Sequence, residues 1–97
     1  MALMGCNLQH EAYVECVGAD TGFNCTVEHK KGGSAIEACW DVSVVCINGT
    51  KTKASTCHTV QPKSKSTKFM PVKDFPGADK CDKAQTVQVE NLKLNIK

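Results

Sequence analysis

The sequence contains no arginine, only four leucines and only five aromatic residues, and it has no long apolar run. Twelve lysines are nearly balanced by ten acidic residues, so the chain lacks the strong positive charge of a nucleic-acid-binding protein. No apolar run approaches the roughly 20 residues that a membrane-spanning helix needs. Gly-x-Ser-x-Gly and phosphate-binding glycine loops are also absent from the sequence. We therefore expect a non-enzymatic protein without a cofactor or a nucleic-acid partner.

β-Branched residues are abundant, since valine, isoleucine and threonine together number twenty-one. These residue types favour strands over helices. Alternation of apolar and polar residues marks the individual strands, with non-helical connections between them. Ser34 and Glu37 form a possible helical capping box, but the segment is too short for a stable helix and is interpreted as the start of a strand. The predicted strands are residues 12–17, 23–28, 38–47, 50–60, 68–72 and 86–96, the last with a bulge near Glu90-Asn91.

Seven cysteines are the most unusual feature of the composition. No two of them have the C-x-x-C spacing of zinc ribbons or thioredoxin-like proteins. A domain of this size buries only roughly 60–65% of its unfolded surface, and each disulfide adds about 2–4 kcal/mol. We therefore predict three structural disulfides, no metal site and an extracytoplasmic location, in the periplasm, at the outer membrane or secreted. The six predicted disulfide cysteines are Cys16, Cys25, Cys39, Cys46, Cys57 and Cys81.

The seventh cysteine, Cys6, follows Leu3-Met4-Gly5 near the start of the chain. These four residues resemble the end of a bacterial lipoprotein signal, in which a small residue precedes a cysteine that becomes acylated. The resemblance implies lipidation of Cys6, and a membrane contact made only through that lipid anchor. The alternative is a cloning-derived Met1-Ala2 and an ordinary thiol at Cys6. Residues 1–10 are interpreted as a signal remnant or linker, and residues 11–97 as one domain.

The most regular segment is a hairpin that runs from Ala38 to Val60, with the Asn48-Gly49 turn signal at its tip. A two-residue turn would place Lys51 and Lys53 on the face that carries Trp40. One extra loop residue would place Thr52, Ala54 and Thr56 on that face instead. Because this register avoids burying two lysines, we predict a bulged hairpin with Val44 opposite Ala54.

Six to seven short strands with this spacing indicate an all-β, antiparallel sandwich. The pattern from Cys39 to Phe69 consists of an alternating strand, the Asn48-Gly49 turn, a return strand, the polar loop Gln61-Pro62-Lys63-Ser64 and an aromatic residue. It resembles bacterial extracytoplasmic Ig-like domains, of which the FxLYD type is the nearest. The resemblance implies a small, disulfide-stapled Ig-like β-sandwich that is not an enzyme.

The same resemblance implies an inter-sheet disulfide between Cys25 and Cys46, with Trp40 nearby. Cys39 and Cys57 lie on the opposite face of the hairpin, where they are able to meet across the two strands. This assignment leaves Cys16 to pair with Cys81. It is one of the fifteen connectivities that six cysteines allow.

Five lysines form a basic stretch on the return strand and the loop after it: Lys51, Lys53, Lys63, Lys65 and Lys68. Their charge favours contact with a polyanion, such as anionic lipid, lipopolysaccharide or a glycan. The alternative is that they prevent an edge strand from pairing with another chain.

Other residues that are able to carry chemistry have structural explanations. His10, His29 and His58 are interpreted as surface or strand residues. Cys57 and His58 are adjacent on a strand, so they point to opposite faces and make no nucleophilic pair. Asn24-Cys25-Thr26 and Asn48-Gly49-Thr50 match the glycosylation sequon, although turn chemistry also explains Asn48.

These features favour a non-enzymatic binding or structural module of the cell envelope, within a lipid-anchored lipoprotein. We expect it to contact a protein or a polyanionic partner through an exposed strand edge or loop face. The alternative is a secreted, cysteine-rich effector or inhibitor that acts on a host or competitor enzyme. A third possibility is a metal-binding or redox module.

Overall fold

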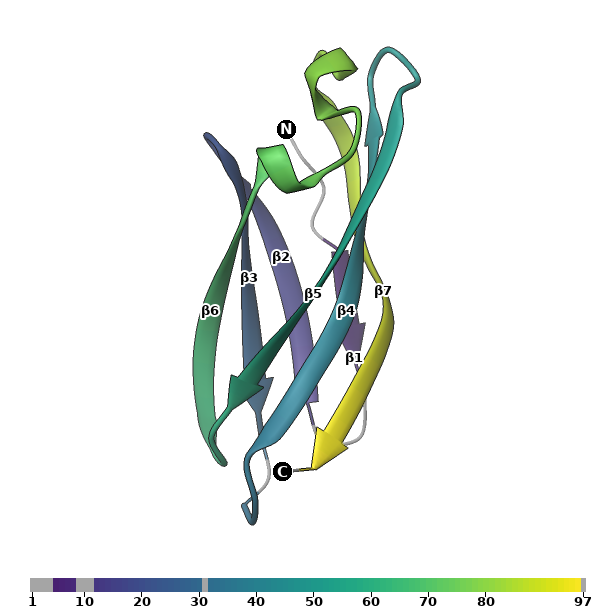
Figure 1. The fold of residues 1–97 in the computed structure, drawn as a ribbon. Helices are drawn as coiled ribbons and strands as arrows, with labels where there is room; N and C mark the ends of the chain where they lie inside the picture. The colour runs from purple at the N-terminus through teal and green to yellow at the C-terminus, as the bar shows by residue number, and fades with distance from the viewer. Residues whose placement is uncertain (1–4, 9–11, 31, 97) are drawn as a thin grey trace.

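The computed structural model describes residues 5–8, 12–30 and 32–96. The prediction of an all-β domain is confirmed, because these residues form two antiparallel sheets and two short 3₁₀ turns (Figure 1). One sheet has the strand order β1-β2-β3-β6 and the other has the order β5-β4-β7. The strands are β1 (Gly5–Leu8), β2 (Ala12–Ala19), β3 (Gly22–His29), β4 (Ile36–Cys46), β5 (Lys51–Val60), β6 (Ser64–Pro71) and β7 (Ala84–Ile96); the 3₁₀ turns are η1 (Val72–Asp74) and η2 (Ala78–Lys80).

The core lies between the two sheets, and β4 contributes to it along its whole length. Every second residue of β4 is buried, because successive side chains of a strand point to opposite faces. Trp40 is the largest of these side chains and is 1% exposed. The facing sheet supplies buried residues such as Val14 and Val27, and these pack into the same cluster. The result is a sandwich-like arrangement with one continuous core.

The β4–β5 hairpin has the extra loop residue that the sequence predicts. The Gly49 backbone N–H donates to the Cys46 carbonyl at 2.9 Å, and the Cys46 N–H donates to the Thr50 carbonyl at 2.7 Å. Gly49 has a φ of 93°, a left-handed conformation that glycine adopts without steric cost. The hydrogen bond between Cys46 and Thr50 therefore closes a three-residue loop, 47–49, and β5 begins one residue later, at Lys51.

In this register Thr52, Ala54 and Thr56 lie opposite Val44, Val42 and Trp40, respectively. The predicted face is confirmed, and Lys51 and Lys53 are exposed. The predicted pairing of Val44 with Ala54 is wrong by two residues, since Val44 pairs with Thr52. The prediction assumed that the extra loop residue follows Asn48-Gly49, whereas it precedes these residues, at Ile47.

A bulge in β7 is also confirmed. Cys39 pairs with Lys93, but Asp41 pairs with Glu90, so β7 has one extra residue between these positions. Asn91 takes up the irregularity with a φ of 55°, a conformation that asparagine tolerates better than most residues. The bulge brings two apolar phases of β7 onto one face: Val87, Val89 and Leu92 are all buried.

β6 differs from the sequence-based expectation, which placed a polar loop at residues 61–68 and a strand at 68–72. The strand begins at Ser64 and ends at Pro71. Its polar residues pair in register with β3, from Ser64 opposite His29 to Pro71 opposite Gly22. Because β6 is the last strand of its sheet, backbone hydrogen bonds to β3 suffice and an apolar alternation is not required.

Three disulfides connect the six predicted cysteines: Cys16–Cys25, Cys39–Cys57 and Cys46–Cys81. The expected Cys39–Cys57 pair is present, whereas the expected Cys25–Cys46 and Cys16–Cys81 pairs are wrong. Cys16 and Cys25 stand directly opposite each other in the β2–β3 hairpin, so no inter-sheet bridge forms at Cys25. Restriction of the unfolded chain is expected to stabilise the fold by about 2.6 kcal/mol for Cys16–Cys25, about 3.2 kcal/mol for Cys39–Cys57 and about 3.8 kcal/mol for Cys46–Cys81.

Gly22 of β3 lies against the backbone of β6, and this close approach generates a prediction. A Cβ atom at Gly22 would overlap the Met70 carbonyl oxygen, which belongs to the backbone of β6. We expect Gly22→Ala to lower the unfolding free energy by about 1–3 kcal/mol, as overpacking does elsewhere. Urea titration followed by tryptophan fluorescence measures this change.

Gly32→Ala is the matched control, because the nearest atom to its Cβ would be the flexible Lys63 Cε, at 3.3 Å. We expect little change from this variant. Equal urea midpoints for the two variants would contradict the close approach of β3 and β6.

Candidate functional site

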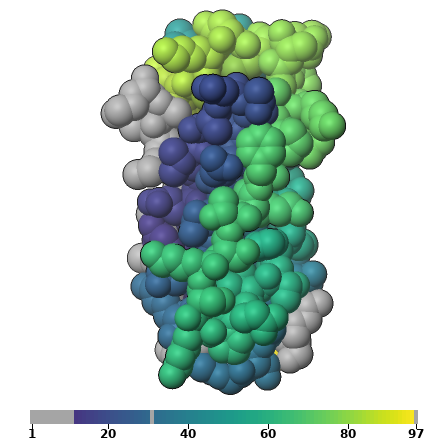
Figure 2. Space-filling view, turned by 90° about the vertical axis from the view of Figure 1, so that its left-hand side faces the viewer, coloured from purple at the N-terminus to yellow at the C-terminus, as the bar shows by residue number. Residues whose placement is uncertain are grey.

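β5 and β6 adjoin each other along one side of the molecule. Each is the last strand of its sheet, so each has one edge without a strand partner within the described residues. The two strands are in contact, and β5 runs diagonally toward the lower end of β6, where β6 begins (Figure 1). Figure 2 looks onto this side, where the green residues of β6 run beside the blue and purple residues of β3 and β2. A hydrogen bond of 2.6 Å joins His58 Nε2 to Ser66 Oγ across the two strands.

The five lysines of the basic stretch lie on these two strands and on the turn between them. Lys51 and Lys53 are exposed on the outer face of the β5-β4-β7 sheet, and Lys65 is exposed on the outer face of the other sheet. Lys63 is in the turn, with a φ of 54°. Lys68 is half-buried and faces inward between the sheets. The structure thus brings the lysines to one side of the molecule but not onto one face.

A groove with a volume of about 510 Å³ lies between the two strand edges. Ala54 and Thr56 of β5 line it on one side, and Lys68 and Phe69 of β6 line it on the other. Phe69 is 43% exposed, which is unusual for an aromatic side chain and adds an apolar surface to the groove. The groove therefore combines backbone edges, hydroxyl groups, an ammonium group and an aromatic ring.

Acidic residues offset part of the positive charge around the groove. Lys53 Nζ lies 3.4 Å from Glu90 Oε1, and Lys65 lies opposite Glu28 in the register of β6 and β3. Asp74 lines one end of the groove. A surface ion pair such as Lys53–Glu90 contributes roughly 0–1 kcal/mol. The five lysines outnumber these three acidic residues, so this side of the molecule has a net positive charge.

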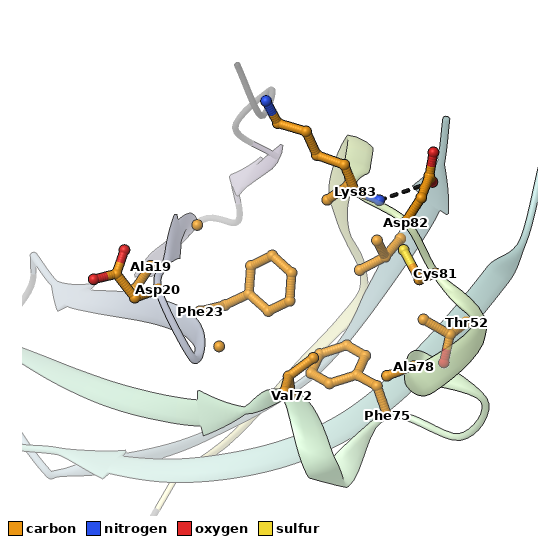
Figure 3. A pocket seen from close by; sticks show the side chains of 14 residues that line it. Ala19, Asp20, Phe23, Thr52, Val72, Phe75, Ala78, Cys81, Asp82 and Lys83 are labelled. Atoms are coloured by element: carbon orange, nitrogen blue, oxygen red, sulfur yellow. Dashed lines mark hydrogen bonds between the residues drawn. The ribbon is translucent and has the colours of Figure 1, made fainter. Parts of the chain in front are cut away.

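A second hollow, with a volume of about 490 Å³, opens at one end of the two sheets (Figure 3). Phe23 and Phe75 form part of its lining, with ring centroids 5.2 Å apart and ring planes tilted by 55°. Figure 3 shows both rings inside the hollow, whereas the Asp20 and Lys83 side chains point away from it. The sequence did not predict this hollow, because Phe75 lies in a segment without apolar periodicity. Phe75 next to Pro76 was the only signal.

The tip of the β4–β5 hairpin is tied to the segment that follows η2. Asn48 Nδ2 donates to the Lys80 carbonyl at 2.8 Å, and Asn48 Oδ1 accepts a hydrogen bond from the Thr50 N–H at 3.0 Å. The Asp82 carboxylate accepts from the Asn48 N–H at 3.1 Å. The side chain of this sequon asparagine therefore has a structural role. The other sequon asparagine, Asn24, is exposed on β3.

The histidines are not brought together. His29 is 2% exposed, and its Nε2 lies 3.0 Å from the Ser34 carbonyl oxygen, to which it donates. His58 bonds to Ser66 instead. The Ser66–His58 contact has the geometry of a nucleophile and its base, but no carboxylate hydrogen-bonds to His58 within residues 5–8, 12–30 and 32–96. His10 lies outside the described residues.

A polar cluster secures the bulge on the outer face of the β5-β4-β7 sheet. The two carboxylate oxygens of Asp41 accept hydrogen bonds from Ser55 Oγ at 2.5 Å and from Asn91 Nδ2 at 2.8 Å. The hydrogen bond from Ser55, then that from Asn91, lower the pKa of Asp41 below 3.8, and Lys53 and Lys93 add to the effect.

Cys6 lies in β1, where its backbone pairs with that of Glu15, and its side chain lies outside the described part of the chain. The three disulfides use the other six cysteines. β1, residues 5–8, is a strand of the first sheet, although the sequence-based interpretation began the domain at residue 11. In the described ranges, no helix has the length and apolar character needed to cross a membrane.

Comparisons with protein families, with curated proteins and with solved structures find no match to this chain. Lys53 and Lys68 line the groove between β5 and β6, and the other three lysines that the sequence singled out lie outside its lining.

The Asp41 cluster generates a prediction about pH. Its lowered pKa means that the ionised carboxylate stabilises the fold above the ordinary aspartate pKa, and that this stability is lost as the pH falls through the lowered value. We expect Asp41→Asn to lower the unfolding free energy by about 1 kcal/mol or less at pH 7. The difference from the wild type should disappear in strong acid. Urea unfolding across a pH series measures both effects.

Asp79→Asn is the control, since Asp79 is exposed on η2 and distant in the chain from the bulge. A constant difference between Asp41→Asn and the wild type at all pH values would contradict an electrostatic origin.

Proposed function

We propose that this protein is a non-enzymatic binding module of an extracytoplasmic compartment, and that it binds an extended, acidic segment of a partner protein in the groove between β5 and β6. The observation that carries the proposal is a groove between two strand edges that is lined by Lys53 of β5 and by Lys68 of β6. An added strand satisfies free backbone groups, and acidic side chains complement the lysines.

The compartment follows from the disulfides. Three disulfides in so small a domain suggest an oxidising environment, because a reducing cytosol keeps thiols free. Lipidation of Cys6 is part of the same proposal. It is supported by the Leu3-Met4-Gly5-Cys6 pattern and by the pairing of all six other cysteines.

We further propose that the domain is an Ig-like sandwich in the broad sense, related to the FxLYD type. Two antiparallel layers with a buried tryptophan on a central strand support this assignment. The strand order differs from that of constant-type Ig domains, since β2 lies between β1 and β3. In constant-type Ig domains the second strand lies between the first and the fifth.

The groove offers more to a peptide than to a flexible polyanion. A sulfated or phosphorylated polymer needs only positive charge, which the lysines supply on any face. An extended peptide also uses the strand edges, the half-buried Lys68 and the exposed ring of Phe69. The partner is therefore assigned as an acidic peptide segment, and a sulfated polysaccharide serves as the competing probe.

The test measures fluorescence anisotropy of a labelled, glutamate-rich octapeptide titrated with the protein. We expect saturable binding that weakens with salt, and Lys68→Gln should weaken it about three- to tenfold, which corresponds to roughly 0.7–1.4 kcal/mol. Lys93→Gln is the matched control, because Lys93 lies on β7, across the sheet from β5. A glutamine-rich octapeptide controls for charge.

Three outcomes overturn the assignment. Equal weakening by Lys68→Gln and Lys93→Gln would show attraction by net charge alone. Binding of the glutamine-rich peptide with the same affinity would remove the role of the lysines. Binding of heparin fragments without binding of the acidic peptide would make the partner a polyanion.

A further inference from the structure

Two of the three disulfides connect neighbouring strands, but they lie in different environments. Cys16–Cys25 joins β2 to β3, and both residues are 0% exposed. Cys39–Cys57 joins β4 to β5 on the outer face of the β5-β4-β7 sheet, where Cys57 is exposed and Cys39 is half-buried. In both pairs the cysteines stand directly opposite each other. The two bonds thus differ chiefly in access to solvent, and access controls thiol–disulfide exchange.

The surroundings of Cys39–Cys57 suit attack by an external thiol. A hollow with a volume of about 490 Å³ lies beside the bond, and Cys39, Cys57 and Lys93 are among the residues that line it. Lys93 is exposed and pairs with Cys39 on the side away from Cys57. A lysine ammonium beside a sulfur stabilises the thiolate that leaves during exchange.

A carboxylate completes a set of donor atoms at the same place. One carboxylate oxygen of Glu37 and the sulfurs of Cys39 and Cys57 all lie within 4.8 Å of one another. Glu37 precedes Cys39 by two residues on β4, so both point to the outer face of the sheet. Two thiolates and a carboxylate are ligands that zinc accepts, and three protein ligands leave a fourth position for water. The disulfide itself is not such a ligand set, because its sulfurs carry no charge.

We propose that Cys39–Cys57 is a reversible redox site whose reduced form, together with Glu37, binds a zinc ion. An external thiol, either a small molecule or a dithiol protein, supplies two electrons and two protons. Its two S–H groups become one disulfide, while the Cys39–Cys57 bond breaks and leaves two thiols. Zinc binding then releases the two thiol protons to solvent. The hollow beside the bond adjoins the groove between β5 and β6, since Ser55 and Thr56 line both, but reduction and zinc binding require no bound peptide.

The first experiment maps reduction in a Cys6→Ser variant, so that the seventh cysteine contributes no signal. The folded protein is incubated with increasing concentrations of dithiothreitol, alkylated without denaturant, and digested for mass spectrometry. We expect Cys39 and Cys57 to carry the label at concentrations that leave the other four cysteines unlabelled. Labelling of Cys16 and Cys25 at the same concentration, or of Cys46 and Cys81 first, would overturn the redox site.

Lys93 provides a second readout that a purely structural bond would not give. We expect Lys93→Gln to slow reduction of Cys39–Cys57 several-fold, with unchanged near-ultraviolet circular dichroism. Lys51→Gln is the matched control, since Lys51 is exposed on the same sheet but six residues from Cys57 along β5. Equal rates for the two variants would remove Lys93 from the site.

The second experiment measures zinc binding by competition with a chromophoric chelator. The selectively reduced protein should bind one zinc ion per chain, and the oxidised protein should bind none. Glu37→Gln should weaken binding by about tenfold or more, as loss of a metal-site group does, whereas Glu28→Gln, on the other sheet, should not. The Cys39→Ser, Cys57→Ser double variant must still fold and must not bind zinc. A reduced protein without zinc affinity, or a double variant that fails to fold, would overturn the metal site.

Discussion

The alternation of buried and outward-facing residues along β4 is the constraint on which the rest of the structure depends. β4 is the centre of its sheet, so it fixes the position of both β5 and β7. A shift of either neighbour by one residue would move that neighbour's whole set of side chains to the other face. The three-residue loop at 47–49 and the bulge at Asn91 are two of the places where the chain adjusts to this requirement. Both irregularities serve to keep apolar residues inward and lysines outward.

The disulfides add covalent links to a domain whose core contains few aromatic residues. The domain has one tryptophan and few other aromatic residues, and its long dimension of 44 Å is about twice its other two dimensions. Cys16–Cys25 lies within the core, whereas Cys46–Cys81 secures the segment after η2 to the end of β4. Phe75 and the Asn48 hydrogen bonds hold the same end. Cys39–Cys57 differs, since the strands that it joins already share a hydrogen-bonded register.

The sequence predicted those features that the apolar pattern determines. The bulged hairpin followed from the cost of burying Lys51 and Lys53, and the β7 bulge followed from two apolar phases around Glu90-Asn91. The start of β6 did not follow, because an edge strand is held by backbone hydrogen bonds that side-chain patterns do not record. The Cys25–Cys46 pair was wrong for a related reason. The register of the β2–β3 hairpin puts Cys25 opposite Cys16, and no local pattern encodes that register. The groove could not be predicted from the sequence, because it depends on how the two sheets lie relative to each other, although the lysines that line it were identified.

The two interpretations of these lysines, protection of an edge and attraction of an acidic partner, describe one physical effect. A second copy of the chain that approached the β5 or β6 edge would bring its own lysines against these, at a cost in electrostatic repulsion. An acidic strand would instead gain attraction and would satisfy the same free backbone groups. The half-buried Lys68 sharpens this discrimination, because a charge removed from bulk water interacts more strongly with its partner. The lysines that keep a second copy of the chain from pairing with this edge therefore also make the edge selective for an acidic strand.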